Sequence, residues 1–470
     1  MRNELLDRFD EWGSRPAVIE GDAVYSYRDL AGRIREAEET LRASQVRPHD
    51  PVVLNGDFSF LSIATLLALY RNRNVVIPVV NLTEASLAAI TEACRPNHVA
   101  TVGECLTIAP AALPTGATEE PGATTTATPS MPAATAAGYG QLAGADAAGL
   151  VLLSSGSTGV PKAILHNLDA IVAAKVGRMT RVSPRPANML MFLLFDHIGG
   201  INSLLGVLRA AGTAVVPALR TPEEICRLVE KHRIRLLPTS PTFLNLVLIG
   251  DFHEKYDLSS LRLITYGTEP MPEDLLRRVN EAFGRARLLQ TFGTSETGIA
   301  TTTSDSSRST YFRIDDPNVQ YRVVDGELQI KSVTQFLGYL NYPTDSLTED
   351  GWFRTRDLVA QSDDGSIRIE GRAQQVINVG GEKLLPHELE SILITSPLVD
   401  DCVVYARANA ITGQSVCVDI RPSAPTTRAE LRRHVVAFLT GRVEAFKIPS
   451  RINLVDSIAV SERFKKKRSL

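Results

Sequence analysis

The chain has 470 residues, 44% of them hydrophobic and 22% charged, which is enough for two or more domains with sizeable cores. Its formal net charge of −3 argues against nucleic acid or an anionic membrane as the main partner. The five cysteines lack C-x-x-C spacing, which excludes the usual zinc motifs, and their odd number argues against a disulfide framework. The start of the chain lacks the apolar core of a signal peptide, and no apolar run is long enough to span a bilayer, so we expect a cytoplasmic protein.

Apolar runs alternate with helix-length amphipathic runs early in the chain. The stretch from Asp50 to Val80 contains a short apolar run, an amphipathic run at Phe58 to Tyr70 and a second apolar run. This rhythm predicts strand, helix and strand, and such units place helices on both faces of a mostly parallel sheet. We therefore predict an α/β fold. Residues 105–148 are rich in Ala, Thr and Pro, so we expect a flexible surface connection there.

A loop of glycines and small hydroxyl residues follows the strand-like run Gly149 to Leu153. Such a loop turns backbone N–H groups toward one point, while its hydroxyls and a lysine add donors and charge, which suits a polyphosphate. Its spacing differs from that of a Walker P-loop. The residues concerned are Ser154, Ser155, Gly156, Ser157, Thr158, Gly159 and Lys162.

Three later segments contain residues whose local role can be predicted from their type. Phe292 offers an aromatic face for a purine and Glu296 a carboxylate for Mg²⁺, which prefers few carboxylates together with phosphate oxygens. Ser240 precedes a proline-led helix, a good N-cap pattern. Asp325 and Gly326 predict a hairpin turn.

In order, these segments resemble the AMP-forming adenylating superfamily of acyl-CoA synthetases, non-ribosomal peptide adenylation domains and luciferases. The loop is similar to the motif SSGSTGxPK. Residues 290–298 resemble YGxTExG, and residues 351–358 resemble GWFxTGD. The resemblance continues through residues 368–390, a hinge segment, to the tail at 455–468.

The resemblance implies roles for the matching residues. The loop, Thr158 included, would hold the β- and γ-phosphates of ATP, His197 would gate the carboxylate pocket, and Glu296 would bind Mg²⁺. Lys465 would be the catalytic lysine, although Lys466 and Lys467 are also flexible ammonium groups that could approach an anion. The adenine turn would be Gly267, Thr268 and Glu269, and the purine and α-phosphate segment would be Phe292, Gly293, Thr294 and Ser295. Asp357 would be the carboxylate that binds the ribose, and Arg372 the hinge arginine. The loop at Gly380 and Gly381 would line a pantetheine tunnel, and Lys383 matches the basic position that follows it.

Several positions depart from the family pattern. Phe292 replaces the commoner tyrosine and Ala459 a proline. Arg356 stands where glycine is usual, which puts the conformation of that loop in doubt. Gln374 replaces a charged pivot residue at the hinge, and Phe464 replaces a glycine.

The resemblance implies a large α/β domain over residues 1–371 and a small mobile α+β lid over 372–470, with the active site between them. The implied reaction is attack of a small-molecule acid on ATP·Mg²⁺, giving an acyl-adenylate, then transfer to the thiol of CoA or of a carrier-protein phosphopantetheine. Nitrite activation for transfer to an amine, a diazotase reaction, remains an alternative. A catalytically retired fold that binds a carrier protein is another, for which Arg356 and Gln374 leave room.

Overall fold

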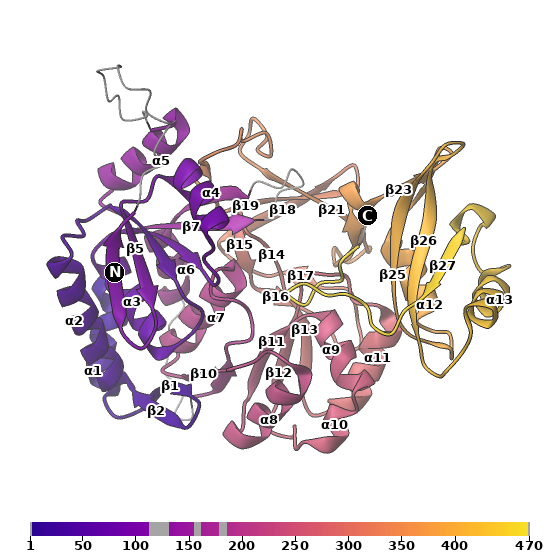
Figure 1. Ribbon diagram of the computed structural model, residues 1–470, viewed down its shortest axis with the longest axis horizontal. Coiled ribbons are helices and arrows are strands. Elements are labelled where there is room, and N and C mark those ends of the chain that lie inside the picture. The colour runs from indigo at the N-terminus through magenta and orange to yellow at the C-terminus, as the bar shows by residue number, and fades with distance from the viewer. Residues whose placement is uncertain (1, 112–130, 155–160, 178–185, 469–470) are drawn as a thin grey trace, which may run out of the picture. The chain divides into compact units, whose positions relative to one another are not determined.

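The computed structural model describes residues 2–111, 131–154, 161–177 and 186–468. Its elements are labelled in Figure 1. The chain divides into two compact units. The first consists of Met1–Ala218, Gly293–Ile299 and Lys331–Phe353, and the second of Leu219–Phe292, Ala300–Ile330 and Arg354–Leu470.

A seven-stranded mixed sheet lies in the first unit. The pairs β3–β4, β3–β5 and β4–β7 are parallel, whereas the outer pairs β5–β6, β7–β8 and β8–β20 are antiparallel. Interior parallel strands are covered on both faces, which explains fully buried sequences such as VVIPV. The order is β20 (Gly338–Tyr339), β8 (Lys162–Asn167), β7 (Gly149–Ser154), β4 (Val75–Val79), β3 (Pro51–Asn55), β5 (His98–Val102) and β6 (Leu106–Pro110).

The strand, helix and strand expected between Asp50 and Val80 are confirmed as β3, α3 and β4. A second group of strands in this unit has the order β9 (Asn188–Leu190), β10 (Thr213–Val216), β1 (Pro16–Glu20) and β2 (Ala23–Ser26). Helices accompany both groups: α1 (Arg2–Trp12), α2 (Tyr27–Ala43), α3 (Phe60–Arg71), α4 (Glu84–Cys94), α5 (Ala133–Gly144), α6 (Leu168–Val176) and α7 (Ile198–Arg209). The α/β class is therefore confirmed.

Residues 105–111 and 131–148, the described parts of the range 105–148, differ from the flexible surface connection that their composition predicts. They contain β6 and helix α5, and Leu142 of α5 is buried in an apolar cluster of the first unit. The Tyr139 hydroxyl donates to the carbonyl of Cys94 at 2.7 Å. Small residues allow this packing, because a Cβ at Gly138 would come within 2.6 Å of the Leu165 side chain.

In the second unit, three parallel strands, β11 (Leu236–Thr239), β12 (Leu263–Tyr266) and β13 (Arg287–Gln290), follow one another side by side. Their neighbours along the chain are α8 (Pro222–His232), α9 (Pro241–Ile249), α10 (Phe252–Lys255) and α11 (Glu273–Ala282). The N-cap expected at Ser240 is confirmed, since its side chain accepts from the N–H of Phe243 at 3.2 Å.

A four-stranded sheet comes next, in the order β18 (Val319–Val324), β19 (Glu327–Ser332), β21 (Phe353–Gln361) and β22 (Ile367–Arg372). The predicted turn at Asp325 and Gly326 joins β18 and β19, and both residues have positive φ, 52° and 77°. Short strands complete this part of the chain: β14 (Phe292–Thr294), β15 (Gly298–Ala300), β16 (Thr302–Thr303) and β17 (Arg313–Ile314).

The last hundred residues have an apolar core of their own, running from Ile377 to Ile452. Figure 1 shows β25, β26 and β27 in one sheet, with α12 and α13 beside it. The sheet order is β24 (Glu382–Leu384), β23 (Ile377–Val379), β26 (Gly413–Pro422) and β25 (Val399–Asn409), and β27 (Arg451–Leu454) pairs with β26. The helices are α12 (Pro386–Leu393) and α13 (Arg428–Leu439), with 3₁₀ turns at Ala373–Gln375 and Ala445–Lys447. A small α+β part is thus present, while its exact boundary at residue 372 stays a prediction.

None of the helices in the described ranges combines the length and the apolar character that crossing a membrane requires.

Candidate active site

The predicted site residues are distributed over both units. The first unit holds Ser154, Lys162, His197, Gly293, Thr294, Ser295 and Glu296. The second unit holds Gly267, Thr268, Glu269, Phe292, Asp357, Arg372, Gly380, Gly381, Lys383 and Lys465. Ser155, Gly156, Ser157, Thr158 and Gly159 lie outside the described residues.

In the first unit, Lys162 and Glu296 meet around one tyrosine. The Tyr339 hydroxyl donates to Oε1 of Glu296 at 3.0 Å. Nζ of Lys162 lies 4.9 Å from the centroid of the Tyr339 ring and 5.5 Å from that of Tyr342, as in a cation–π contact. Lys162 begins β8, opposite Ser154 at the end of β7, so the two strands hold both ends of the predicted phosphate loop. The structure therefore groups an ammonium and a carboxylate without pairing them directly.

His166 fixes the turn that carries Glu296. It lies on β8 four residues after Lys162, on the same face of the strand, and its Nε2 lies 2.7 Å from the carbonyl oxygen of Ser295. Burial lowers its pKa to about 4, so the ring is neutral at pH 7 and Nε2 donates its hydrogen. The Thr294 hydroxyl accepts from the N–H groups of Glu296 and Thr297 at 3.2 and 3.1 Å. Sequence reasoning missed His166, because its partner is 129 residues away.

Glu296 has the chemistry of a single-carboxylate Mg²⁺ ligand. Its Oε1 accepts the neutral Tyr339 hydroxyl, and its carboxylate is paired with no lysine or arginine among the residues that the structure describes. Mg²⁺ bound by one or two carboxylates and substrate phosphates requires no more protein ligands than this. The described ranges contain no group of three acidic, histidine or cysteine side chains that could form a cage for a metal ion. The residues present therefore fit a metal ion that arrives with a nucleotide.

His197 caps helix α7. Its Nδ1 accepts from the N–H of Gly199 at 3.1 Å. A Cβ at Gly200 would lie 2.0 Å from the carbonyl oxygen of Leu194. The packing of the chain on itself thus explains this glycine, and the gating role of His197 stays a prediction.

In the second unit, Asp357 and Arg372 lie opposite each other on β21 and β22. Nε of Arg372 donates to Oδ1 of Asp357 at 3.1 Å, and the Asp357 side chain is only 8% exposed. Arg356, where glycine was expected, adopts the left-handed conformation at φ 60° that glycine favours. Its N–H donates to Glu327 Oε1 at 2.8 Å, and Arg356 lies inside strand β21 rather than in a loop.

The predicted adenine turn follows β12. Thr268 has a φ of 73°, and a Cβ at Gly267 would lie 2.8 Å from the carbonyl oxygen of Thr291, so the backbone is close-packed there. Glu269 accepts from the Thr242 hydroxyl at 3.0 Å. Burial raises the pKa of Glu269, against the opposing effects of Lys466 and Thr242. Among the described residues its Oε1 is buried without a hydrogen-bond partner.

Phe292 is buried rather than open. Its side chain is 7% exposed, and its ring lies 6.4 Å from that of Phe312 in a stacked arrangement inside an apolar cluster. Little of the ring is left for a purine, so its stacking role stays a prediction.

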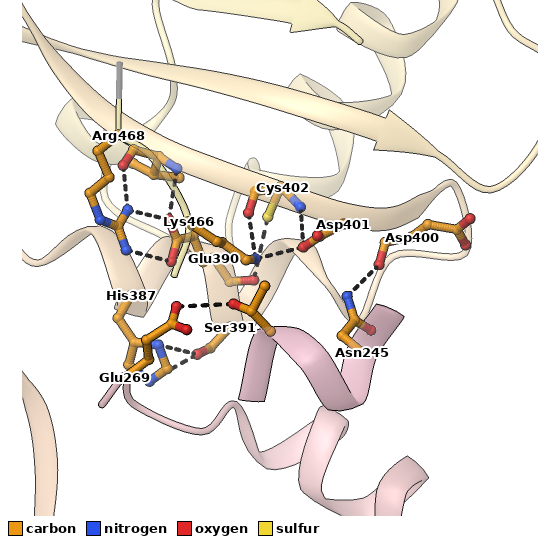
Figure 2. A network of polar contacts seen from close by, with 12 residues as sticks. Asn245, Glu269, His387, Glu390, Ser391, Asp400, Asp401, Cys402, Lys466 and Arg468 are labelled. Carbon is orange, nitrogen blue, oxygen red and sulfur yellow. Dashed lines mark hydrogen bonds and ion pairs between the residues drawn. The ribbon is translucent and has the colours of Figure 1, made fainter. Parts of the chain in front are cut away.

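The C-terminal tail places its consecutive lysines in different surroundings. Nζ of Lys466 donates to Oδ1 of Asp401 at 2.5 Å and to the carbonyl oxygen of Cys402 at 2.7 Å (Figure 2). Lys465 makes no ion pair among the described residues. Burial and the neighbouring Arg372 lower its pKa, whereas Glu269 raises it. These contacts favour Lys465 over Lys466 as the amine available to a ligand.

Gly380 and Gly381 form the turn between β23 and β24, with φ of 64° and 100°. The N–H of Gly381 donates to Oδ1 of Asn378 at 2.9 Å, and Lys383 follows on β24. The turn alone explains both glycines, and the pantetheine tunnel stays a prediction.

Comparison with known proteins identifies the family. Residues 6–340 match the family described as AMP-binding enzyme, and residues 388–465 match its C-terminal domain. The chain belongs to the AMP-binding enzyme family. The second match ends at Lys465. The superfamily inferred from the motifs is confirmed.

Several curated relatives are named as ligases or synthases. Pyochelin synthase PchD of Pseudomonas aeruginosa is 30% identical over 329 residues, which cover 64% of this chain and 59% of the relative. The 2,3-dihydroxybenzoate-AMP ligase of Bacillus subtilis is 30% identical over 329 residues, 65% of this chain and 60% of that protein. The chain thus spans about three fifths of the length of these relatives. Across 96% of the chain and 88% of the relative, it is 26% identical to 4-coumarate--CoA ligase 3 of Oryza sativa subsp. japonica.

Solved structures share the fold. An anthranilate CoA ligase, AuaEII, in complex with anthranoyl-AMP has a TM-score of 0.79 at 19% identity, covering 99% of this chain and 95% of that one. ATP-bound MatB from Rhodopseudomonas palustris also has a TM-score of 0.79, at 22% identity, covering 98% and 97%.

Proposed function

We propose that this protein activates a carboxylic acid with ATP, releasing pyrophosphate and forming an acyl-adenylate. The observation that carries the proposal is that both parts of the AMP-binding family match in order, with Lys465 inside the second match and outside any ion pair in the described residues. A retired fold has no need to keep an unpaired, half-buried lysine next to Asp357 and Arg372.

A carboxylate is already ionised at pH 7, so the reaction needs no general base. The protein has to position two anions and to stabilise charge on the phosphoryl oxygens. Lys465 and Lys162 supply positive charge, and Asp357 accepts hydrogen bonds from the ribose hydroxyls. His166 holds the turn that carries Glu296. Mg²⁺ held by Glu296 would supply charge neutralisation on the phosphates.

The acid is proposed to be aromatic, and the second step to be transfer to a thiol. Relatives are named for 2,3-dihydroxybenzoate, indoleacetate and 4-coumarate, and several of those names include CoA. The Gly380 and Gly381 turn is the proposed path of the pantetheine arm of CoA or of a carrier protein.

The test is pyrophosphate release from ATP·Mg²⁺ across a panel of benzoates, cinnamates, arylacetates, amino acids, fatty acids and nitrite, with and without CoA. We expect turnover with an aromatic acid and a thioester product when CoA is added. Turnover with nitrite alone would replace the proposal with a diazotase. Silence across the panel from folded, ATP-binding protein would contradict adenylation.

A further inference from the structure

Three consecutive lysines, Lys465, Lys466 and Lys467, create an ambiguity in the tail. Each has the same chain length and charge, so a shift of the tail by one residue would replace one ammonium with another. The backbone near them forms a tight hairpin in which the N–H of Ser461 donates to the carbonyl of Lys465, and that of Lys467 to the carbonyl of Ala459, both at 2.8 Å. Backbone hydrogen bonds of this kind do not distinguish one lysine from the next.

Side chains do distinguish them. Lys466 contacts the carbonyl of Cys402, and Nη1 of Arg468 donates to that of Val404 at 2.6 Å. Lys466 and Arg468 are two residues apart in the tail, and Cys402 and Val404 are two residues apart in β25. Cations on one face of the extended tail therefore contact alternate carbonyls along β25. Lys465, offset by one residue, lies on the other face.

Two buried carboxylates hold this match. Asp401 accepts from Lys466, and Glu390 of α12 forms an ion pair with Arg468 through both guanidinium nitrogens Nη1 and Nη2 (Figure 2). The Asp401 and Glu390 side chains are 3% and 8% exposed. Glu390 Oε1 also accepts from the N–H of Val404 at 2.7 Å, which joins the carboxylate to the same stretch of β25.

We propose that Asp401 and Glu390 set the register of the lysine run, so that Lys466 and Arg468 act as positioning residues and Lys465 alone presents its amine to the reacting phosphate. This inference rests on the proposed adenylation. A buried ion pair is suited to such a role, because its main attested advantage over an apolar contact is that it specifies one register. A shift by one residue would leave Asp401 with Lys465 or Lys467 and deprive Glu390 of Arg468.

The test compares Lys466→Met, the double variant Lys466→Met/Asp401→Leu, and Lys467→Met as the control in the same run. Lys466→Met leaves Asp401 buried and unpaired, so the tail can shift to satisfy it, and we expect adenylation to fall about 100-fold, as for other misplacements of a reacting group. The double variant removes both charges and the reason to shift, so most of that loss should be recovered. Exposed Lys467 should tolerate methionine with a change of at most about twofold.

Two further readouts separate positioning from simple destabilisation. Thioester formation from a supplied acyl-adenylate should be spared in Lys466→Met, whereas a loosened fold would lower both half-reactions. The Lys467 amide hydrogen, bonded to Ala459, should exchange faster in Lys466→Met and return to the wild-type rate in the double variant. Exchange needs no catalysis, so it tests the register even if no acid proves to be a substrate.

Unchanged adenylation in Lys466→Met would overturn the inference, and so would a double variant as defective as the single one. If Lys466→Met fails to fold, Asp401→Asn takes its place, because asparagine keeps the shape but loses the charge; full activity with an unchanged exchange rate would then be the contradicting result.

Discussion

The two units hold their charged site residues in different ways. In the first unit, Glu296 is held by a tyrosine hydroxyl and Lys162 by two tyrosine rings, all neutral partners. In the tail of the second unit, Lys466 and Arg468 are held by the carboxylates of Asp401 and Glu390.

Neutral partners fix a charge without cancelling it, whereas the ion pairs of Lys466 and Arg468 use that charge to hold the tail. Under the proposed function, the difference separates Lys162, Glu296 and Lys465, whose charges would act on a ligand, from Lys466 and Arg468, whose charges hold the chain together. It would also explain how a run of three lysines contains one functional amine, the proposed Lys465, and one structural cation, Lys466. The predictions below test this division, starting with the largest expected effect.

Removing one partner of a structural ion pair should be costly. Arg468→Met leaves Glu390 buried and without its guanidinium, so we expect about 3–5 kcal/mol of unfolding free energy to be lost. Urea unfolding measures it. The matched control is Arg313→Met, whose partner Asp364 is 47% exposed and stays solvated, so it should show no measurable change. Equal losses in both variants would contradict the distinction.

His166 should make the first unit sensitive to acid. Its pKa is lowered to about 4 in the folded protein. Above pH 6.5 the His166 side chain is neutral in the unfolded chain as well, so its protonation costs no stability there. Between pH 6.5 and 4 only the unfolded state gains the proton, which should cost about 3 kcal/mol of stability. Urea unfolding of wild type and His166→Gln across this range gives the value, and parallel pH curves would show that His166 contributes nothing.

Tyr339→Phe keeps the ring beside Lys162 but removes the hydroxyl that holds Glu296. We expect the free energy of unfolding to fall by about 1 kcal/mol, which is typical of one hydrogen bond. We also expect a rise in the Mg²⁺ concentration that gives half-maximal pyrophosphate release. An unchanged Mg²⁺ requirement would mean that the hydroxyl does not orient the carboxylate.

The smallest effect concerns the backbone. Arg356→Gly relieves a left-handed conformation and should stabilise the second unit by about 0.5 kcal/mol. Arg354→Gly, two residues earlier on the same strand, should destabilise it by a similar amount, because extended backbone gains nothing from glycine. Thermal unfolding of both variants compares the signs, and destabilisation in both would mean that Arg356 makes contacts worth more than its strain.

Local patterns in the sequence identify several elements and the family. The run from Pro51 to Val79, the cap at Ser240 and the turn at Asp325 depend on neighbours within a few residues, and all three were predicted correctly. Arg356 is visible in the sequence as a departure from the family pattern, but an arginine gives no sign that the backbone there is left-handed.

Contacts between residues that are far apart in the sequence could not be predicted from it. His166 reaches Ser295, Lys466 reaches Asp401, and Phe292 is covered by Phe312, and none of these pairings has a local signature. A partial signal did exist in the tail: Lys466 and Arg468 alternate with exposed Lys467, which is the pattern of an extended segment with one buried face.

The most direct measurement of the division between functional and structural charge is the adenylation rate of Lys465→Ala beside that of Lys466→Met/Asp401→Leu. We expect Lys465→Ala to lose about 1,000-fold, because no other group replaces a preorganised cation at the phosphate. The double variant should keep most of its activity although it has lost a lysine and its buried partner. If Lys465→Ala stays active while the double variant is inactive, Lys466 is the functional amine and the account is wrong.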